Sequence, residues 1–296
     1  MAALRSRGLA LRRETLSPTI LGHVFVHRWH TFRARSQPVS LADRDRRFLD
    51  ASASYRRVRQ AAAAGDDSER SRLELHGLTW WIPNRDVHAG AAVKQRFPFR
   101  GILQTREFSV GGLMLDIGAN VGRMAIPRVI LGDATAAYCA EPDPISYACL
   151  ASNVIDNGLA GVVMPDQTAI GDRIGRVFLR RAGGSGGFHV VPGPLDDTVE
   201  VACTTLDAWV SALDVDLQAV TFIKVDVEGF ERRLFAGADT VRSQRHIVWQ
   251  MEIKPASLRH NGDEPADLYA DLAGAFSHFI DLNREAVGPR HSQQVG

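Results

Sequence analysis

The sequence predicts an α/β fold built on a doubly wound, mostly parallel sheet with helices on both faces. Short apolar runs, typical of buried strands, alternate along the chain with longer helix-like segments. The run at 113–117 stops at a small-residue turn and leads directly into a helix-like segment, as a parallel strand does. With 296 residues and 45% hydrophobic content, the chain can bury one sizeable core plus an appendage.

The first hundred residues predict a basic extension ahead of that core. Residues 1–100 hold 19 Lys and Arg against 9 Asp and Glu, whereas the rest of the chain holds 16 against 25. Such a basic extension can bind nucleic acid, anionic lipid or a phosphorylated substrate. Alternatively, it is a solvated helical face that packs on the acidic remainder of the chain. Within it, 41–64 predicts a helix and 72–82 a strand or hairpin stopped by Pro83.

Cysteine and hydropathy patterns point to a reducing compartment. Cys139, Cys149 and Cys203 are too few for a disulfide framework, and none has C-x-x-C spacing. No apolar run approaches the roughly 18 residues of a membrane span, and the opening lacks a signal-peptide hydrophobic region. We therefore expect a cytoplasmic protein with no transmembrane segment; the Arg-rich opening leaves an organelle transit peptide as the alternative.

The turn after the first central strand predicts a ligand site. Gly118 and Gly122 allow close approach of the backbone, and the N–H groups of the following helix favour a carboxylate or phosphate. Asp116 adds a carboxylate suited to an ammonium group or a hydroxyl. A dinucleotide fingerprint would need glycine at 120 and 123, where this chain has Asn120 and Arg123, so NAD is disfavoured.

The next two strands complete the predicted ligand. The strand at 136–140 ends in Glu141, an acidic side chain that can accept two hydrogen bonds from a ribose. A third strand at 162–170 brings Asp166 to the place of an adenine amine, with a helix-capping or loop carboxylate as the alternative role of this residue. These features predict an S-adenosylmethionine (SAM) site, with a structural turn beside a solvated Glu as the alternative. The expected cofactor-binding residues are Asp116, Gly118, Asn120, Gly122, Glu141, Pro142, Asp166 and Ala169.

Further segments complete the alternation of helices and strands. A helix is expected at 144–157, because Pro144 can occupy its first turn and Asn157-Gly158 ends it. Short strands are expected at 176–181 and 198–203. They flank a glycine run at 182–187, which is either a mobile lid or an ordinary surface loop and is not a P-loop.

A strand expected at 220–227 carries the candidate catalytic groups. Alternation places Lys224, Asp226 and Glu228 on one face, and a following buried strand carries Glu252 to a matching height. Ionisable groups on a buried strand are costly unless they are paired or used. The carboxylates can position or deprotonate an acceptor hydroxyl, with Asp226 ranked first and Lys224 pairing one of them. A divalent cation held by these carboxylates is the alternative, although no His joins them.

Four motifs in this order resemble the FkbM family of SAM-dependent methyltransferases: LDIGANVG at 115–122, EPDP at 141–144 with Leu150 and Asn153, TLD at 205–207, and FIKVDVEGFE at 222–231. The resemblance covers about 113–254 and does not reach the first 70 residues. It implies a Rossmann-like class I methyltransferase fold. It also implies methylation, mostly on oxygen, of natural products, sugars and related small molecules.

The resulting division of the chain is a basic, partly helical extension at 1–70, a strand or hairpin lead-in at 71–110, a SAM-binding methyltransferase domain at 111–285 and a tail at 286–296. Residues 1–40 are not expected to be needed for SAM affinity. The expected partner is a small-molecule or glycan acceptor, and a homodimer is left open. The other functions considered are a non-catalytic SAM- or nucleoside-binding regulatory module and a nucleic-acid methyltransferase. The latter is disfavoured because the chain lacks an Asn/Asp-Pro-Pro-Tyr motif.

Overall fold

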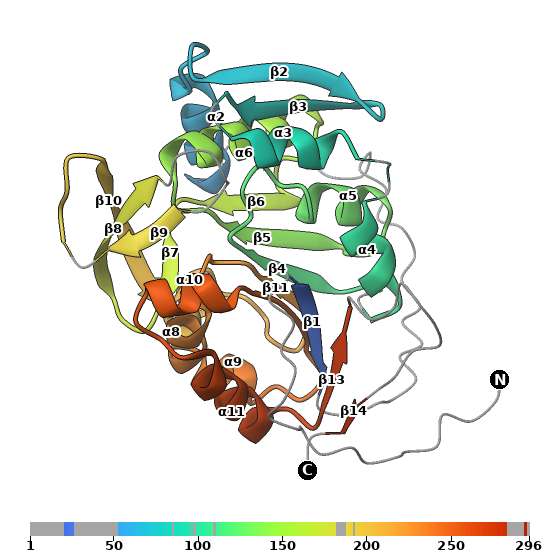
Figure 1. Ribbon diagram of the computed structural model, residues 1–296. Coiled ribbons are helices and arrows are strands. Elements are labelled where there is room, and N and C mark those ends of the chain that lie inside the picture. The colour runs from blue at the N-terminus through green and yellow to red at the C-terminus, as the bar shows by residue number, and fades with distance from the viewer. Residues whose placement is uncertain are drawn as a thin grey trace.

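A central sheet of eight strands organises the computed structural model (Figure 1). Five neighbouring strands, from β6 to β12, run parallel, so the doubly wound, mostly parallel sheet is confirmed. The structure describes residues 21–26, 53–84, 86–95, 97, 99–108, 111–181, 188–191, 193–282 and 293–294. The strand order is β14 (Gln293–Gln294), β13 (His278–Asp281), β1 (Leu21–Val26), β12 (Val248–Ile253), β11 (Val220–Val225), β4 (Leu113–Ile117), β5 (Ala136–Ala140), β6 (Val163–Asp166).

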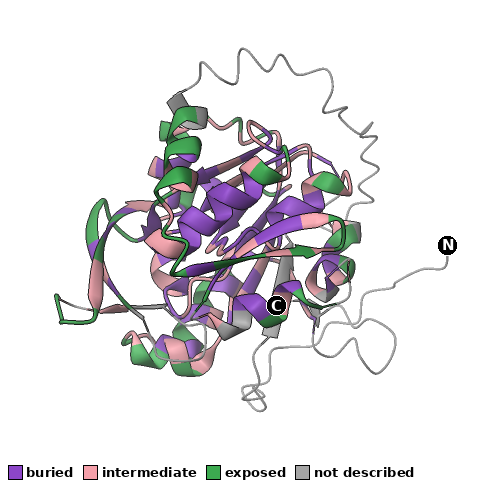
Figure 2. Ribbon diagram, turned by 90° about the horizontal axis from the view of Figure 1, so that it is seen from above, coloured by how far each residue is buried: buried purple, intermediate pink, exposed green. Residues whose placement is uncertain are grey.

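Helices cover both faces of this sheet and bury two hydrophobic cores. Figure 2 shows the buried residues concentrated in the sheet and on the inner sides of the helices. One face carries α2 (Ala53–Ala64), the hairpin β2 (Arg70–Leu75) and β3 (Leu78–Pro83), α3 (Val87–Val93), α4 (Arg100–Thr105), η2 (Arg106–Phe108), α5 (Ala125–Ile130) and α6 (Pro144–Asp156). The other carries α7 (Leu206–Ala212), α8 (Glu231–Ala236), α9 (Asp239–Arg242), α10 (Pro255–His260) and α11 (Pro265–Ala275).

Strand alternation decides which core each side chain enters. Met114 of β4 and Phe222 of β11 belong to the core beneath the hairpin, whereas Leu115 belongs to the opposite core. Side chains two residues apart share a face, so Asp116 and Lys224 point to the hairpin side. The two strands pair with Asp116 directly opposite Lys224. Two ionisable groups are thereby placed side by side in the interior.

A smaller sheet stands beside the main one, in the order β7 (Ala169–Gly171), β10 (Thr198–Thr205), β8 (Gly175–Arg181), β9 (Phe188–Val191). The single strand predicted at 162–170 is wrong, because the chain turns at Thr168, whose N–H bonds the carbonyl of Asp166. That turn sends β7 into the second sheet. The glycine run at 182–187 lies outside the described residues.

Several predicted elements are present with changed limits. The hairpin β2–β3 is confirmed, and α6 is capped by Asp143, whose carboxylate accepts hydrogen bonds from two backbone N–H groups at the helix start. Of the helix predicted at 41–64, α2 is described and 41–52 lies outside the described residues. The predicted end of β11 is wrong: it stops at Val225, because Asp226 and Glu228 enter a turn in which Glu228 has a φ of 52°.

The strand β1 comes from the predicted N-terminal extension and lies within the main sheet. It runs antiparallel to both β12 and β13 and separates them. Its pairing places Gly22 opposite Glu252. The segment at 21–26 therefore helps to form the sheet that carries one of the candidate catalytic groups. In the described part of the chain, no helix is long and apolar enough to cross a membrane.

Candidate active site

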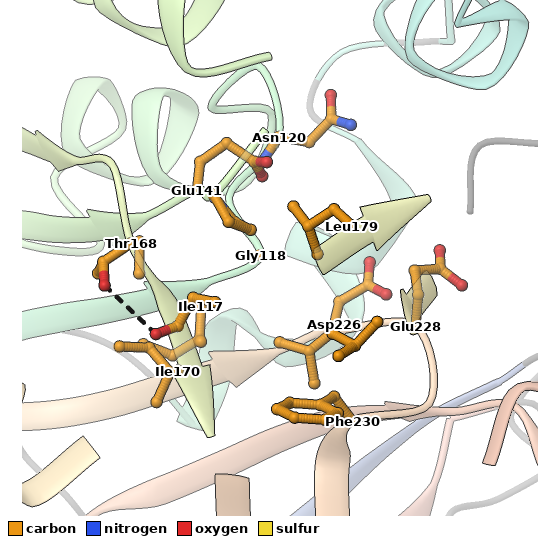
Figure 3. Close-up of a pocket in the computed structure, with 15 residues that line it drawn as sticks. Ile117, Gly118, Asn120, Glu141, Thr168, Ile170, Leu179, Asp226, Glu228 and Phe230 are labelled. Atoms are coloured by element: carbon orange, nitrogen blue, oxygen red, sulfur yellow. Dashed lines mark hydrogen bonds between the residues drawn. The ribbon is translucent and has the colours of Figure 1, made fainter. Parts of the chain in front are cut away.

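A pocket of about 650 Å³, including its open mouth, lies at the carboxyl ends of the parallel strands. The loops after β4, β5 and β11 meet there, and the second sheet closes one side (Figure 3). The lining residues are Ile117, Gly118, Asn120, Ala140, Glu141, Pro142, Thr168, Ala169, Ile170, Leu179, Val190, Asp226, Val227, Glu228 and Phe230.

The carboxylate of Glu141 is fixed by the backbone of two loops. The N–H of Asn120 donates to Oε2 at 2.8 Å and the N–H of Asp143 donates to Oε1 at 2.9 Å. The side chain is buried, and burial raises the pKa of Glu141 to about 8. Each oxygen retains further acceptor capacity, so this carboxylate can receive a pair of neighbouring hydroxyl groups.

Two glycines of the β4 turn have φ of 73° and 86° and allow close packing within the protein. A Cβ on Gly118 would lie 1.8 Å from the carbonyl oxygen of Asp226, so the loops after β4 and β11 can touch only because this residue is glycine. A Cβ on Gly122 would lie 2.7 Å from Leu150 of α6. Gly118 lines the pocket, whereas Gly122 lies beneath it against a helix.

Asn120 ties the lead-in segment to the pocket. Its side-chain amide donates to Asp86 Oδ2 at 3.2 Å, and Asp86 Oδ1 accepts from the N–H of Ala89 at the start of α3. Asn120 has a φ of 50°, a conformation that asparagine tolerates better than most residues. The turn and the segment before β4 are therefore held together at the pocket rim.

Besides Gly122, two predicted cofactor contacts lie away from the pocket lining. Asp116 is fully buried on the hairpin side of the sheet, and Asp166 accepts a 2.8 Å hydrogen bond from the indole N–H of Trp209. Asp116 has an ion-pair contact with Lys224 inside the protein, so neither carboxylate contacts the pocket. Of the predicted residues, it brings Gly118, Asn120, Glu141, Pro142 and Ala169 to the pocket.

Three carboxylates and two lysines meet at the ends of β11 and β12. Lys224 Nζ lies 3.5 Å from Asp226 Oδ2, as the predicted pairing requires. Lys254 Nζ lies 2.5 Å from Glu228 Oε1 and 3.4 Å from Glu252 Oε1. Asp226 and Glu228 line the pocket (Figure 3), whereas Glu252 and the two lysines lie outside its lining.

Charges within this cluster shift its pKa values in opposite directions. Burial alone would raise the pKa of Asp226, but Lys224 and Lys254 outweigh it and hold that pKa below its ordinary value. The charge of Asp226, followed by burial, raises the pKa of Glu252 to about 7. Burial and then Asp226 raise the pKa of Glu228. The cluster thus holds one firmly ionised carboxylate beside one that exchanges a proton near neutrality.

Sequence reasoning missed several residues in or beside the pocket. Lys254 follows Glu252 by two positions near the end of β12, and same-face spacing could have indicated it. Leu179 and Val190 come from the second sheet, and nothing local in the sequence places them at the pocket. Within the described residues, no group of three His, Cys, Asp or Glu side chains is arranged to hold a metal ion.

A family model described as the methyltransferase FkbM domain matches residues 116–275, more than half of the chain. The chain belongs to the FkbM methyltransferase family. The matched region contains every pocket residue named above and ends within α11. Its fold is the Rossmann-like class I methyltransferase fold.

Two FkbM proteins and a more distant structure are similar to this chain. The 31-O-demethyl-FK506 methyltransferase FkbM of Streptomyces tacrolimicus is 27% identical over 189 residues, 52% of this chain and 71% of that protein. The crystal structure of methyltransferase FkbM from Methylobacillus flagellatus KT has 22% identity and a TM-score of 0.42. The match covers 59% of this chain and 40% of that one. TYW2 of P. horikoshii in complex with MeSAdo has 18% identity and a TM-score of 0.28, over 34% of this chain and 36% of that chain.

Proposed function

We propose that this FkbM-family protein is a SAM-dependent methyltransferase that methylates a hydroxyl oxygen on a small molecule, natural product or sugar. One observation carries the proposal. A carboxylate held by two backbone N–H groups, Glu141, shares a pocket with a second carboxylate, Asp226, whose side chain is 25% exposed. The first suits the ribose of a nucleoside, and the second suits an acceptor group or a cation.

The residues present fit SAM. Glu141 would accept hydrogen bonds from the ribose hydroxyls, while the turn containing Gly118 and Asn120 would hold the amino-acid end. Ile170 and Phe230 supply apolar surface for the adenine ring. When bound, SAM supplies a methyl group activated by a positively charged sulfur. Asp116, Gly122 and Asp166 belong to the proposed site as supports of these residues.

The carboxylate cluster would prepare the acceptor. Asp226 accepts a hydrogen bond from the acceptor hydroxyl, orients its oxygen and draws off its proton. Glu252, whose pKa is near neutrality, then takes up that proton from Asp226. Lys224 and Lys254 keep the carboxylates in position through their ion pairs. Glu228 adds a second acceptor at the pocket wall.

The acceptor class is drawn from two lines of support. The described residues that line the pocket include carboxylates and no Lys or Arg, which favours a neutral hydroxyl or a cationic group over an anion. The 31-O-demethyl-FK506 methyltransferase is named for a natural product and for an O-methyl position. Both are compatible with a hydroxylated natural product or sugar as the acceptor. We also propose 111–285 as the methyltransferase domain, with 21–26 contributing a strand to it.

The test combines binding with transfer. Calorimetry with SAM should give a single site on the full chain, and NAD should not compete for it. Methyl-labelled SAM should then transfer label to at least one of three probes: a macrolide with an unmethylated hydroxyl, a monosaccharide or a catechol. Preferred binding of NAD would refute the cofactor. Label recovered only in added oligonucleotides, with salt-dependent binding, would refute the acceptor class.

A further inference from the structure

Lys224 occupies the centre of a buried charge array. Its Nζ lies 3.5 Å from Asp116 Oδ1 and 3.5 Å from Asp226 Oδ2. Its 2.7 Å hydrogen bond, however, goes to the carbonyl oxygen of Gly118. The ammonium group is thus anchored on the turn after β4 while its charge is divided between two carboxylates on different strands.

Asp116 is an unusual carboxylate because it has no access to solvent or to the pocket. Its exposed fraction is 0%, and neither oxygen has a hydrogen-bond partner among the described residues. In the sheet it lies between Lys224 on β11 and Cys139 on β5. An ionised carboxylate in such a place is costly unless a cation compensates it, and Lys224 is the cation in ion-pair contact.

Asp226 is the other carboxylate that shares Lys224, and it faces the pocket. Its Oδ1 has no hydrogen-bond partner in the described part of the chain, and its side chain is 25% exposed. Without the charge of Asp116, Lys224 would pair with Asp226 alone and would neutralise its charge more fully. In this arrangement Asp116 offsets the positive charge of Lys224, and Asp226 keeps more of its negative charge.

We propose that Asp116 is a positioning residue: as the buried counter-charge of Lys224, it limits the neutralisation of Asp226, so that a negative carboxylate faces the pocket. This inference rests on the SAM site proposed above, because the positive sulfur of SAM is the group that would respond to that charge. Asp116 acts through Lys224 and contacts neither SAM nor the acceptor.

The test compares SAM with S-adenosylhomocysteine, which lacks the methyl group and the positive charge. Calorimetry gives the ratio of their affinities without any acceptor. D116N should lower the preference for SAM by about three- to tenfold, because Lys224 then neutralises Asp226 more fully. K224M should raise that preference. The double variant D116N/K224M, which removes one charge of each sign, should return it to within about twofold of the parent.

D133N is the matched control. Asp133 is also buried, also carries an oxygen without a hydrogen-bond partner among the described residues, and pairs with Arg106 at 2.8 Å. It lies just before β5, at the end of the sheet opposite the pocket. Its loss should lower stability in a thermal melt while leaving the ratio of affinities unchanged.

Three outcomes would overturn the inference. D116N could weaken both ligands in parallel, as a merely structural residue would, or leave the ratio unchanged, as a neutral Asp116 would. The double variant could keep the low ratio of D116N, which would show that Asp116 does not act through Lys224. Should K224M fail to fold, D116N and the double variant still decide. A parent protein that binds neither ligand would instead refute the proposed function itself.

Discussion

In the half of the pocket formed after β4 and β5, backbone N–H groups of Asn120 and Asp143 hold the carboxylate of Glu141. In the half formed after β11 and β12, two lysine side chains hold three carboxylates. Backbone donors fix one geometry, because moving them would require the loops themselves to move. Lysine partners are flexible, and they share their charge among several acceptors.

The pKa values of the two halves have different causes. Burial is the leading cause for Glu141, whereas the charge of Asp226 is the leading cause for Glu252. A rigid, isolated carboxylate suits recognition of hydroxyl groups. Coupled carboxylates suit proton transfer, because the proton affinity of one depends on the charge of its neighbour. We therefore propose binding for the first half and chemistry for the second.

The largest expected effect is on turnover in D226N. The substitution keeps the size of the side chain and removes its charge, so methyl transfer should fall about 10²- to 10⁴-fold while SAM affinity stays within about threefold. Radiolabelled transfer and calorimetry measure the two quantities. E228Q and E252Q, assayed in parallel, rank the other carboxylates, and a thermal melt controls for folding. Parental turnover by folded D226N would remove Asp226 from the chemistry.

The next largest effect is expected from two N-terminal truncations, one that ends before β1 and one that removes it. Deleting residues 1–20 leaves β1 intact, whereas deleting 1–26 removes the strand paired with both β12 and β13. At about 1 kcal/mol for each lost hydrogen bond, the longer deletion should cost on the order of 5 kcal/mol and lower the melting temperature by about 10 °C or more. SAM binding by the 1–26 deletion also tests part of the prediction that residues 1–40 are not needed for SAM affinity.

The truncations should be compared by two losses: the loss of methyl transfer and the loss of SAM affinity. Because β1 lies against the strand that carries Glu252, methyl transfer should fall more than SAM affinity. An equal loss of both would mean that the sheet, and not the acceptor half alone, depends on β1. Equal melting temperatures for the two truncations would contradict the placement of β1.

A smaller effect is expected for the binding half. Above about pH 8, where Glu141 is ionised, E141A should weaken SAM binding by about 1.5–3 kcal/mol, the usual scale for hydrogen bonds to a charged group. D166N is the matched comparison, because its carboxylate already accepts from Trp209 and lies outside the pocket lining. It should change SAM affinity by less than about threefold. Calorimetry showing the reverse order would place the ribose at Asp166.

Another effect concerns stability and pH. The folded pKa values of about 8 for Glu141 and about 7 for Glu252 lie above the ordinary value of 4.5. Their stabilisation is therefore complete below about pH 4.5 and lost as the pH rises through these values. Urea denaturation between pH 4.5 and 8.5 should show a decline on the order of 3–5 kcal/mol for each group, because one pKa unit corresponds to about 1.4 kcal/mol.

Two substitutions show how much of the fall in stability with rising pH is due to Glu141 and how much to Glu252. E141Q should remove only a share of the part that extends to about pH 8, because burial also raises the pKa of Glu231 to about 8. D226N should remove the part near pH 7, because the charge of Asp226 is the main reason for the raised pKa of Glu252. The pKa of Asp226 itself is lowered, so its own contribution falls at more acid pH. A D226N curve that keeps the parental shape would mean that the two carboxyls are not coupled.

The sequence by itself determined the features that depend on neighbouring residues. The strand–turn–helix junction at Gly118, the carboxylate of Glu141 after its strand and the capped helix α6 all follow from local patterns. The motif spacing also identified the FkbM family. Asp226 and Glu228 were expected at the pocket because they follow a parallel strand whose carboxyl end faces the crevice.

Only the tertiary structure decided which partner each buried side chain has. Asp116 was expected at the ligand, yet the register between β4 and β11 sets it opposite Lys224 inside the protein. Asp166 likewise meets Trp209, 43 residues away along the chain. The pairing of β1 beside β12 joins segments separated by more than 200 residues. These contacts depend on strand order and register, which arise from packing of the whole sheet and leave no local signal in the sequence.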